Sequence, residues 1–159
     1  MAMSAAEVVG ACIEQGVTLA TAESLTAGLV AARIADVPGC SAMLRGGVVA
    51  YATEAKEQVL GLDPALLEHV VSEPVAAELA RAATRVLDSD IGVGTTGVAG
   101  PDWLDGEPPG TVWIAVFDRR TELALTSKLQ LSGDRATIRE GTVSASLALV
   151  LQVLSEPGE

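Results

Sequence analysis

Segments with helical and strand periodicity alternate along most of this 159-residue chain, and this alternation limits the folds open to it. Helices are predicted where apolar residues recur every three or four positions, and strands where short β-prone runs follow a glycine or a polar break. A chain that alternates in this way buries a sheet between layers of helices. We therefore predict a single α/β domain over residues 1–159, a three-layer αβα sandwich with a mixed, mostly buried sheet.

Capping signals and glycines give the approximate limits of these elements. Ser4-Ala5-Ala6-Glu7 and Ser72-Glu73-Pro74 have the residues of helix N-termini, and the tail 155–159 is expected to be frayed. Helices are predicted over residues 4–15, 25–34, 54–60, 72–87 and 134–154, with a short helix opened by Asp63-Pro64. Strands are predicted over residues 17–21, 46–51, 90–93, 111–117 and 122–131. The last two follow each other directly, which makes the sheet mixed.

The composition limits both the core and the partners. Apolar residues make up 49% of the chain and aromatic residues only 3%, so the core must consist mainly of Ala, Val and Leu. A net charge of −11, without a Lys/Arg stripe, argues against nucleic-acid binding because phosphate backbones are repelled. A small anionic ligand remains compatible with this charge, since backbone N–H groups and one or two Arg can hold it locally.

The cysteines and the N-terminal sequence favour a cytoplasmic protein. Cys12 and Cys40 have neither the number nor the spacing of a disulfide framework or a zinc motif, and we expect them to be reduced. Residues 1–6 lack the basic run of a signal peptide, and no apolar span is long enough to cross a membrane. We expect a soluble cytoplasmic protein without a membrane partner.

The single histidine, His69, narrows the possible chemistry. One histidine excludes metal sites that need two or three, and we expect neither a metal nor a cofactor. A Ser-His-Asp triad would depend on His69, which follows Leu66-Leu67-Glu68 at a predicted helix end. An exposed histidine at a helix terminus is the favoured interpretation.

Ser24 is the first candidate nucleophile. It lies between a predicted strand and a predicted helix, in Ala22-Glu23-Ser24-Leu25-Thr26-Ala27-Gly28. A serine at a helix N-terminus has its Oγ near unpaired N–H groups and the positive end of the helix dipole, which suits a nucleophile and an oxyanion. A plain N-cap is the commoner role of such a serine, and both interpretations are open at this point.

Lys56 and Tyr51 are the next candidates. The chain has eight Arg but only two Lys, and Arg cannot act as a base, whereas the pKa of a buried Lys can be lowered enough to do so. Tyr51 is the only tyrosine and lies at the end of a predicted strand, where ligands bind in α/β sheets. The alternatives are a solvated Lys56 on a helix face and a half-buried aromatic at position 51.

The run from Thr95 to Pro101 follows a predicted strand, and its small residues let backbone N–H groups turn toward an anion. It is not a Walker motif, because no Gly-Lys-Ser/Thr follows. Nor is it a Rossmann fingerprint, because Pro101 falls where a helix would continue. A tight structural turn is the competing interpretation. Arg135, which opens the last helix, is suited either to a phosphate or to a surface ion pair.

Six segments together resemble the CinA C-terminal family, also called nicotinamide-nucleotide amidohydrolases. Each segment alone is weak evidence, but the six occur in the family's order and cover nearly the whole chain. They are Ala22 to Gly28, Gly46 to Tyr51 with Lys56, Val71-Ser72-Glu73-Pro74, Thr96 to Pro101, Pro109 to Val112, and Gly133-Asp134-Arg135.

The resemblance implies an αβα domain that hydrolyses the carboxamide of nicotinamide mononucleotide to nicotinate mononucleotide and ammonia, in pyridine nucleotide recycling and without a metal. By this carry-over Ser24 is the nucleophile, Lys56 is the general base, and Tyr51 orients or activates the pair. The 96–100 loop and Arg135 are expected to hold the ribose phosphate. The substrate-binding residues implied in this way are Thr26, Gly47, Thr96, Gly97, Ala99, Gly100 and Arg135.

Three segments depart from the family pattern. Ala27 replaces the first Gly of a Thr-Gly-Gly sequence, so a positive φ there would be strained. Trp103-Leu104 stands where the family usually has Gly-Gly, which reshapes the ligand mouth, and Pro108-Pro109-Gly110 is stiffer than usual. Larger family members also carry a molybdopterin-binding-like domain. We expect a stand-alone form without it and without metal-dependent pyrophosphatase activity.

Two other functions remain open. The first is a catalytically silent nucleotide-binding or interaction module, favoured by the departures at Ala27 and Trp103 and disfavoured by the intact Ser24, Tyr51 and Lys56. The second is an amidase or esterase that acts on another small substrate with the same nucleophile. The Ala- and Ser-rich final helix permits close packing, either within the core or at a homodimer face.

Overall fold

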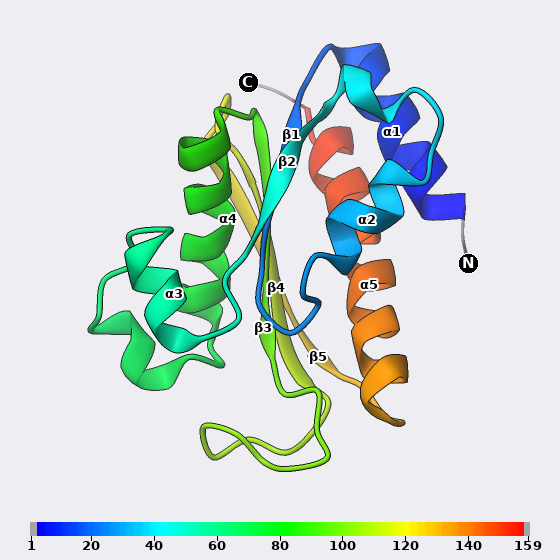
Figure 1. Ribbon diagram of the computed structural model, residues 1–159. Helices are drawn as coiled ribbons and strands as arrows, with labels where there is room; N and C mark the ends of the chain where they lie inside the picture. The colour runs from blue at the N-terminus through cyan, green and yellow to red at the C-terminus, as the bar shows by residue number, and fades with distance from the viewer. Residues whose placement is uncertain (1–2, 158–159) are drawn as a thin grey trace.

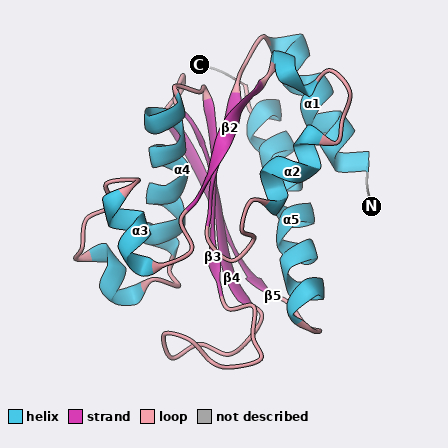
Figure 2. Cartoon of the chain, viewed as in Figure 1, coloured by secondary structure: helices cyan, strands magenta, loops and turns pink. Residues whose placement is uncertain are grey.

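The computed structural model describes residues 3–157 and has the three layers that the sequence predicts (Figure 1). One layer holds α1, α2 and α5, the sheet lies in the middle, and α3 and α4 cover its other face (Figure 2). The helices are α1 (Met3–Gln15), α2 (Leu29–Ala35), α3 (Thr53–Gln58), α4 (Glu73–Leu87) and α5 (Arg135–Ser155), with 3-10 turns η1 (Cys40–Ala42) and η2 (Leu66–His69). The strands are β1 (Leu19–Glu23), β2 (Leu44–Val49), β3 (Ile91–Gly97), β4 (Thr111–Asp118) and β5 (Leu123–Gln130).

The sheet is mixed, as predicted, in the order β2-β1-β3-β4-β5. β1 runs parallel to β2 and to β3, because a helix connects each strand of this half to the next. β4 is antiparallel to β3 and to β5, and a tight turn joins β4 to β5. The carboxyl ends of β1, β2 and β3 therefore meet at one edge of the sheet, where ligands bind in folds of this class.

The second helix begins four residues later than predicted. Residues 24–28 form turns instead, and α2 starts at Leu29. The cause is the backbone of Ala27 and Gly28, with φ of 49° and 91°, which a right-handed helix cannot contain. Ala27 thus occupies a left-handed conformation that costs a non-glycine residue about 1–2 kcal/mol. Ser24 consequently lies in a turn and not at the first residue of a helix.

Two glycines of β3, Gly92 and Gly94, pack against α4. The strand predicted to end at residue 93 continues to Gly97, and Gly92 and Gly94 face α4. A Cβ on Gly92 would lie 1.9 Å from the Ala80 carbonyl oxygen, and one on Gly94 would lie 2.3 Å from the Ala76 carbonyl oxygen. These glycines therefore let the backbones of β3 and α4 approach closely, which is a packing role.

The opposite face of the sheet carries the larger core, which consists of aliphatic residues as predicted. Leu19, Ile91 and Ile114 contribute to it from the sheet, and Val143 and Val150 from α5. The small polar residues of α5 also point inward. Thr142 Oγ1 donates to the Ile138 carbonyl at 2.8 Å and Ser146 Oγ to the Thr142 carbonyl at 2.7 Å, so both buried hydroxyls are satisfied within the helix. These two residues serve the core.

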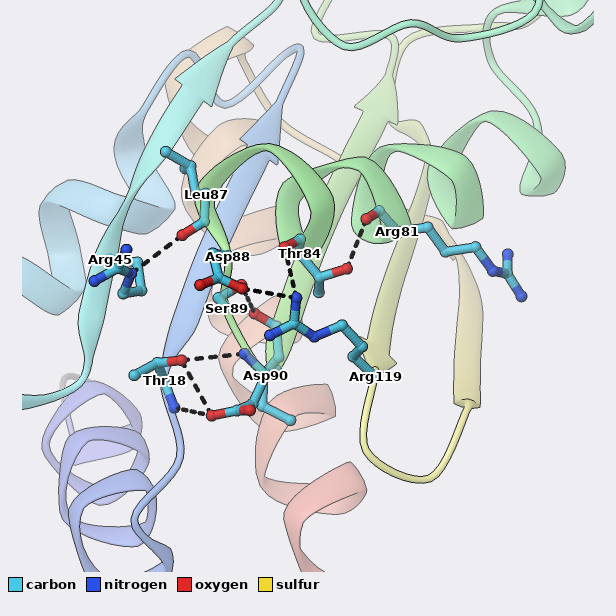
Figure 3. A network of polar contacts seen from close by, with 10 residues as sticks. Thr18, Arg45, Arg81, Thr84, Leu87, Asp88, Ser89, Asp90 and Arg119 are labelled. Atoms are coloured by element: carbon cyan, nitrogen blue, oxygen red, sulfur yellow. Dashed lines mark hydrogen bonds and ion pairs between the residues drawn. The ribbon is translucent and has the colours of Figure 1, made fainter.

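A polar network fastens the other edge of the sheet (Figure 3). The Thr18 hydroxyl accepts from the Asp90 N–H, and the backbone N–H of Thr18 donates to Asp90 Oδ2 at 2.9 Å. These two hydrogen bonds tie the start of β3 to the residue before β1. Arg119 Nη1 contacts Asp88 Oδ1 at 3.0 Å, and Arg45 Nε donates to the Leu87 carbonyl at 3.1 Å. The end of α4 is thereby held beside the strands that flank it.

The limits of the first and last helices differ by one residue from the predictions. α1 begins at Met3, one residue before the predicted Ser4 cap, and α5 ends at Ser155. Glu156 and Pro157 follow α5 without regular structure, whereas positions 158 and 159 of the predicted frayed tail lie outside the described residues.

Cys12 and Cys40 are free thiols, and burial raises the pKa of Cys12 to about 11. None of the helices within residues 3–157 combines the length and the apolar character needed to span a membrane.

The close approach of β3 and α4 leads to a stability prediction. Gly94→Ala should lower the free energy of unfolding by about 2–3 kcal/mol, because the added methyl group overlaps the α4 backbone. Gly10→Ala is the matched control, since an added Cβ there meets nothing within 4 Å and favours the α1 helix. Chemical denaturation of both variants checks this. Equal stability of the two would contradict the packing role of Gly94.

Candidate active site

Lys56 is the most unusual side chain of the molecule, because its amine is buried. Only 1% of the residue is exposed. Its Nζ lies 2.9 Å from Ser24 Oγ, 2.8 Å from the Ala50 carbonyl oxygen and 3.2 Å from the Tyr51 carbonyl oxygen. The alternative of a solvated Lys56 on a helix face is therefore excluded. The fold brings the first turn of α3 against the turn that follows β1.

Burial changes the acid–base behaviour of this amine. Desolvation lowers the pKa of Lys56 from its ordinary value of 10.5 to about 8, and the nearby Glu54 carboxylate opposes the shift. A neutral amine has two N–H donors and one lone pair. With the Ala50 and Tyr51 carbonyls as the two acceptors, the lone pair of neutral Lys56 faces the Ser24 hydroxyl. This is the arrangement of a nucleophile beside its base.

β3 holds the backbone of Ser24 in place. The Ser24 N–H points at Thr95, with 3.1 Å to its carbonyl oxygen and 3.2 Å to its Oγ1. Thr95 Oγ1 also lies 2.9 Å from Thr26 Oγ1, and both threonines are fully buried. Because Ser24 directly follows β1 and Thr95 is on the neighbouring strand, sheet pairing determines where the Ser24 side chain projects.

Glu23 is a buried carboxylate directly before Ser24. Its oxygens accept from the Val30 N–H at 2.9 Å, the Ala31 N–H at 3.1 Å and the Thr21 hydroxyl at 2.8 Å. Glu23 thus pairs the first N–H groups of α2, which would otherwise lack partners. The expectation that N–H groups at the start of this helix hold an oxyanion needs correction, because Glu23 already occupies them.

Arg139 holds the same turn from α5. Its Nε donates to the Leu25 carbonyl at 2.9 Å, and its Nη2 donates to the Thr26 carbonyl at 3.1 Å. None of Glu23, Thr95 or Arg139 is predicted as a site residue from the sequence. A usable signal existed for Arg139, which lies four residues after Arg135 and so on the same face of a helix. Glu23 and Thr95 act through contacts across the sheet that periodicity does not reveal.

A cleft of about 310 Å³ opens beside Ser24 at the edge where β1, β2 and β3 end. Six of the predicted site residues line it, namely Ser24, Tyr51, Gly97, Ala99, Gly100 and Arg135. Three do not. The Thr96 hydroxyl donates to the Val70 carbonyl at 2.7 Å, Thr26 contacts Thr95, and a Cβ on Gly47 would overlap Thr21 and Ala31. These three residues support the walls of the site from behind.

Tyr51 and Arg135 meet across the cleft. The Tyr51 hydroxyl accepts from Arg135 Nη2 at 2.6 Å, and Arg135 Nη1 donates to the Gly100 carbonyl. Tyr51 therefore contacts Lys56 through its backbone carbonyl, while its ring is half exposed. Arg135 forms no ion pair within residues 3–157, so the surface ion pair considered for it is not observed.

His69 and a second cavity lie apart from this chemistry. The His69 side chain is 85% exposed, 3.8 Å from Asp105 Oδ1, and does not line the cleft, as expected for a histidine at a helix end. A larger cavity of about 730 Å³ lies at the opposite edge of the sheet, around Asp118 and Arg120. Those two charges pair with each other at 2.7 Å. We place the candidate active site in the smaller cleft because Ser24, whose Oγ contacts the buried Lys56 amine, lines it.

Known proteins share both the sequence and the fold. Residues 2–154 match the family described as CinA C-terminal domain. A CinA-like protein of Mycobacterium marinum is 46% identical over 143 residues, which cover 87% of this chain and 33% of that protein. A CinA-like protein of Frankia casuarinae is 43% identical over 150 residues, which cover 93% of this chain and 34% of that protein. The crystal structure of competence damage-inducible protein A from Klebsiella pneumoniae superposes with a TM-score of 0.92 at 32% identity, over 98% of each chain.

The chain therefore belongs to the CinA C-terminal domain family. This confirms the resemblance carried by the six sequence segments, and the structural match confirms the α/β sandwich. The chain spans about a third of the length of the curated relatives that it matches. Family membership is consistent with an amidohydrolase.

The buried Glu23 carboxylate leads to a second stability prediction. Glu23→Gln should cost about 2–4 kcal/mol, because either orientation of the amide points its NH₂ at an N–H group of Val30 or Ala31. Glu14→Gln on the exposed face of α1 is the matched control and should change stability by less than about 0.5 kcal/mol. Thermal unfolding monitored by circular dichroism checks both. A Glu23→Gln variant as stable as the control would show that this carboxylate does not anchor α2.

The lowered pKa of Lys56 predicts how stability varies with pH. Between a folded pKa of about 8 and an unfolded value of 10.5, only the unfolded chain binds the proton, so the free energy of unfolding rises with pH. Lys56→Met lacks this contribution. The stability of the wild type relative to Lys56→Met should increase by roughly 2–3 kcal/mol between about pH 7 and pH 10. Urea denaturation at each pH measures the difference, and a pH-independent difference would mean that the pKa of Lys56 is not lowered.

Proposed function

We propose that this protein hydrolyses the carboxamide of nicotinamide mononucleotide to nicotinate mononucleotide and ammonia, as a cytoplasmic enzyme of pyridine nucleotide recycling. The observation that carries the proposal is the 2.9 Å contact between the buried Lys56 amine and Ser24 Oγ. A lysine whose pKa is lowered to about 8 is a base that works near neutral pH, and Ser24 is the hydroxyl within its reach.

The reaction begins with the transfer of the Ser24 proton to neutral Lys56. Ser24 Oγ attacks the amide carbon, and protonated Lys56 then supplies a proton to the departing ammonia. Water hydrolyses the resulting acyl-enzyme and regenerates Ser24. The Ala50 and Tyr51 carbonyls accept from the amine in both protonation states, so they stabilise the ammonium that forms transiently. Tyr51 orients the pair through its carbonyl in this scheme.

Backbone N–H groups of residues that line the cleft are the oxyanion donors in this proposal. Within the described part of the chain, the N–H groups of Leu25, Ala99 and Gly100 donate to no other protein group. Gly100 has a φ of 86°, which turns its peptide in a way that a non-glycine residue would resist. Preorganised N–H donors of this kind stabilise the charge of a tetrahedral intermediate.

Arg135 and the segment from Gly97 to Gly100 would bind the ribose phosphate. Arg135 is the only cationic residue among those that line the cleft, and the protein as a whole carries a net charge of −11. An anionic group of the substrate is therefore drawn to Arg135 in the cleft. Phosphate binding exchanges the present contact of Arg135 with the neutral Tyr51 hydroxyl for one in which both partners are charged.

Ammonia release from nicotinamide mononucleotide, measured in the presence of a chelator, tests the proposal. The wild type should turn the substrate over, whereas Ser24→Ala and Lys56→Ala should each lose at least about 10³-fold in kcat. In the wild type, kcat/KM should rise with pH through a pKa of about 8, because only neutral Lys56 accepts the serine proton. Lys128→Ala is the control, since it removes the only other lysine and leaves the cleft intact.

The same experiment separates the alternatives. Turnover of another small amide, but not of nicotinamide mononucleotide, would keep the Ser–Lys mechanism and replace the substrate. Nucleotide binding without turnover of any amide would favour the silent binding module. Turnover that persists in Ser24→Ala would retain the activity and contradict the mechanism.

A further inference from the structure

Trp103 is the most exposed large apolar side chain among the described residues, and it lines the same cleft as Ser24. It is 68% exposed and its neighbour Leu104 is 51% exposed. Both lie in the loop between β3 and β4, at the bottom of Figure 1. An indole exposed to this extent on the lining of the cleft is available to pack against a bound ligand.

The loop holds Trp103 in a defined place. Leu104 and Glu107 exchange two backbone hydrogen bonds of 3.1 Å and 2.9 Å, which closes a small hairpin. The two residues between them, Asp105 and Gly106, have φ of 56° and 73°, as in a type I′ turn. Asp105 Oδ2 also accepts from the Val71 N–H at 3.1 Å and thereby ties the hairpin to the segment before α4. The indole is therefore presented by an ordered hairpin.

The charges around the cleft are distributed unevenly. Arg135 supplies a cation, whereas the hairpin segment next to Trp103 carries Asp102, which also lines the cleft, and Asp105. An indole face is electron-rich and attracts cations, and Trp is the most effective side chain in this role. Arg135 thus suits an anion, and Trp103, next to Asp102 in the chain, suits a flat cationic ring.

We propose that Trp103 is a specificity-determining residue that stacks on a positively charged aromatic ring of the substrate, and so selects pyridinium amides over neutral ones. This inference rests on the proposed function, because nicotinamide mononucleotide carries such a ring next to its carboxamide and an anionic phosphate at its other end. Trp103 contacts the ring, Ser24 reaches the carboxamide, and Arg135 binds the phosphate.

Binding to the Ser24→Ala protein tests this without any need for turnover. The two probes are nicotinamide mononucleotide and its reduced dihydro form, which share the carboxamide, ribose and phosphate but differ in ring charge. Calorimetry should show that Trp103→Gly lowers the preference for the cationic ring by roughly 3- to 30-fold, with Trp103→Phe in between. Trp113→Phe is the matched control, because Trp113 lies on β4 under Lys128 and does not line the cleft.

Two results would overturn the inference. The first is an equal loss of affinity for both probes in Trp103→Gly, which would make Trp103 a plain apolar wall. The second is unchanged affinity together with a changed oligomeric state in size-exclusion chromatography, which would assign the exposed indole to a protein interface.

A failure of the proposed function gives a different pattern. If the wild type hydrolyses no amide but the preference for the cationic probe still depends on Trp103, the proposed reaction is wrong and the ring-binding site remains. If the wild type releases ammonia from nicotinamide mononucleotide and the Trp103 variants keep the KM and kcat of the wild type, the reaction stands and the role of Trp103 is wrong.

Discussion

The buried carboxylate of Glu23 is the interaction on which the arrangement of the site depends. Glu23 is the last residue of β1, and its carboxylate accepts from N–H groups in the first turn of α2. These hydrogen bonds hold the end of the strand close to the start of the helix. The chain between them must then fold as a tight turn, which accounts for the left-handed Ala27. Ser24 is the first residue of that turn, and its position follows from the contact between Glu23 and α2.

The hydrogen bonding of the buried Lys56 amine also depends on this turn. A buried amine needs acceptors, and Ala50 and Tyr51 provide two carbonyls because β2 has already ended and no partner strand uses them. The third hydrogen-bonding position of the amine nitrogen faces Ser24 Oγ. Burial lowers the pKa of the amine to about 8, so the packing that stabilises the fold also lowers the pKa of the proposed base. The resulting site combines an amine of lowered pKa, a hydroxyl and one guanidinium in a protein of high negative charge.

Local signals in the sequence predicted the elements well where local chemistry defines them. Ser72 and Asp134 cap α4 and α5 with their side chains, and both helices were located to within about two residues. The sequence did not predict that β3 includes Gly94, because a glycine in a turn and a glycine packed beneath a helix cannot be distinguished from the sequence alone. The structure places Thr96 and Gly47 behind the cleft, where Thr96 contacts Val70 and Gly47 packs against Thr21 and Ala31.

The sequence by itself determined the α/β class, the mixed sheet, the family, and a short set of candidate groups led by Ser24, Lys56 and Arg135. Residue type and spacing suffice for these, since periodicity, capping and motif order are local properties. Only the tertiary structure decided that Lys56 is buried, that Glu23 occupies the helix N–H groups, and that Trp103 faces the cleft. Each of these depends on contacts between segments that are distant in the chain or on exposure to solvent, and neither is encoded in local sequence pattern.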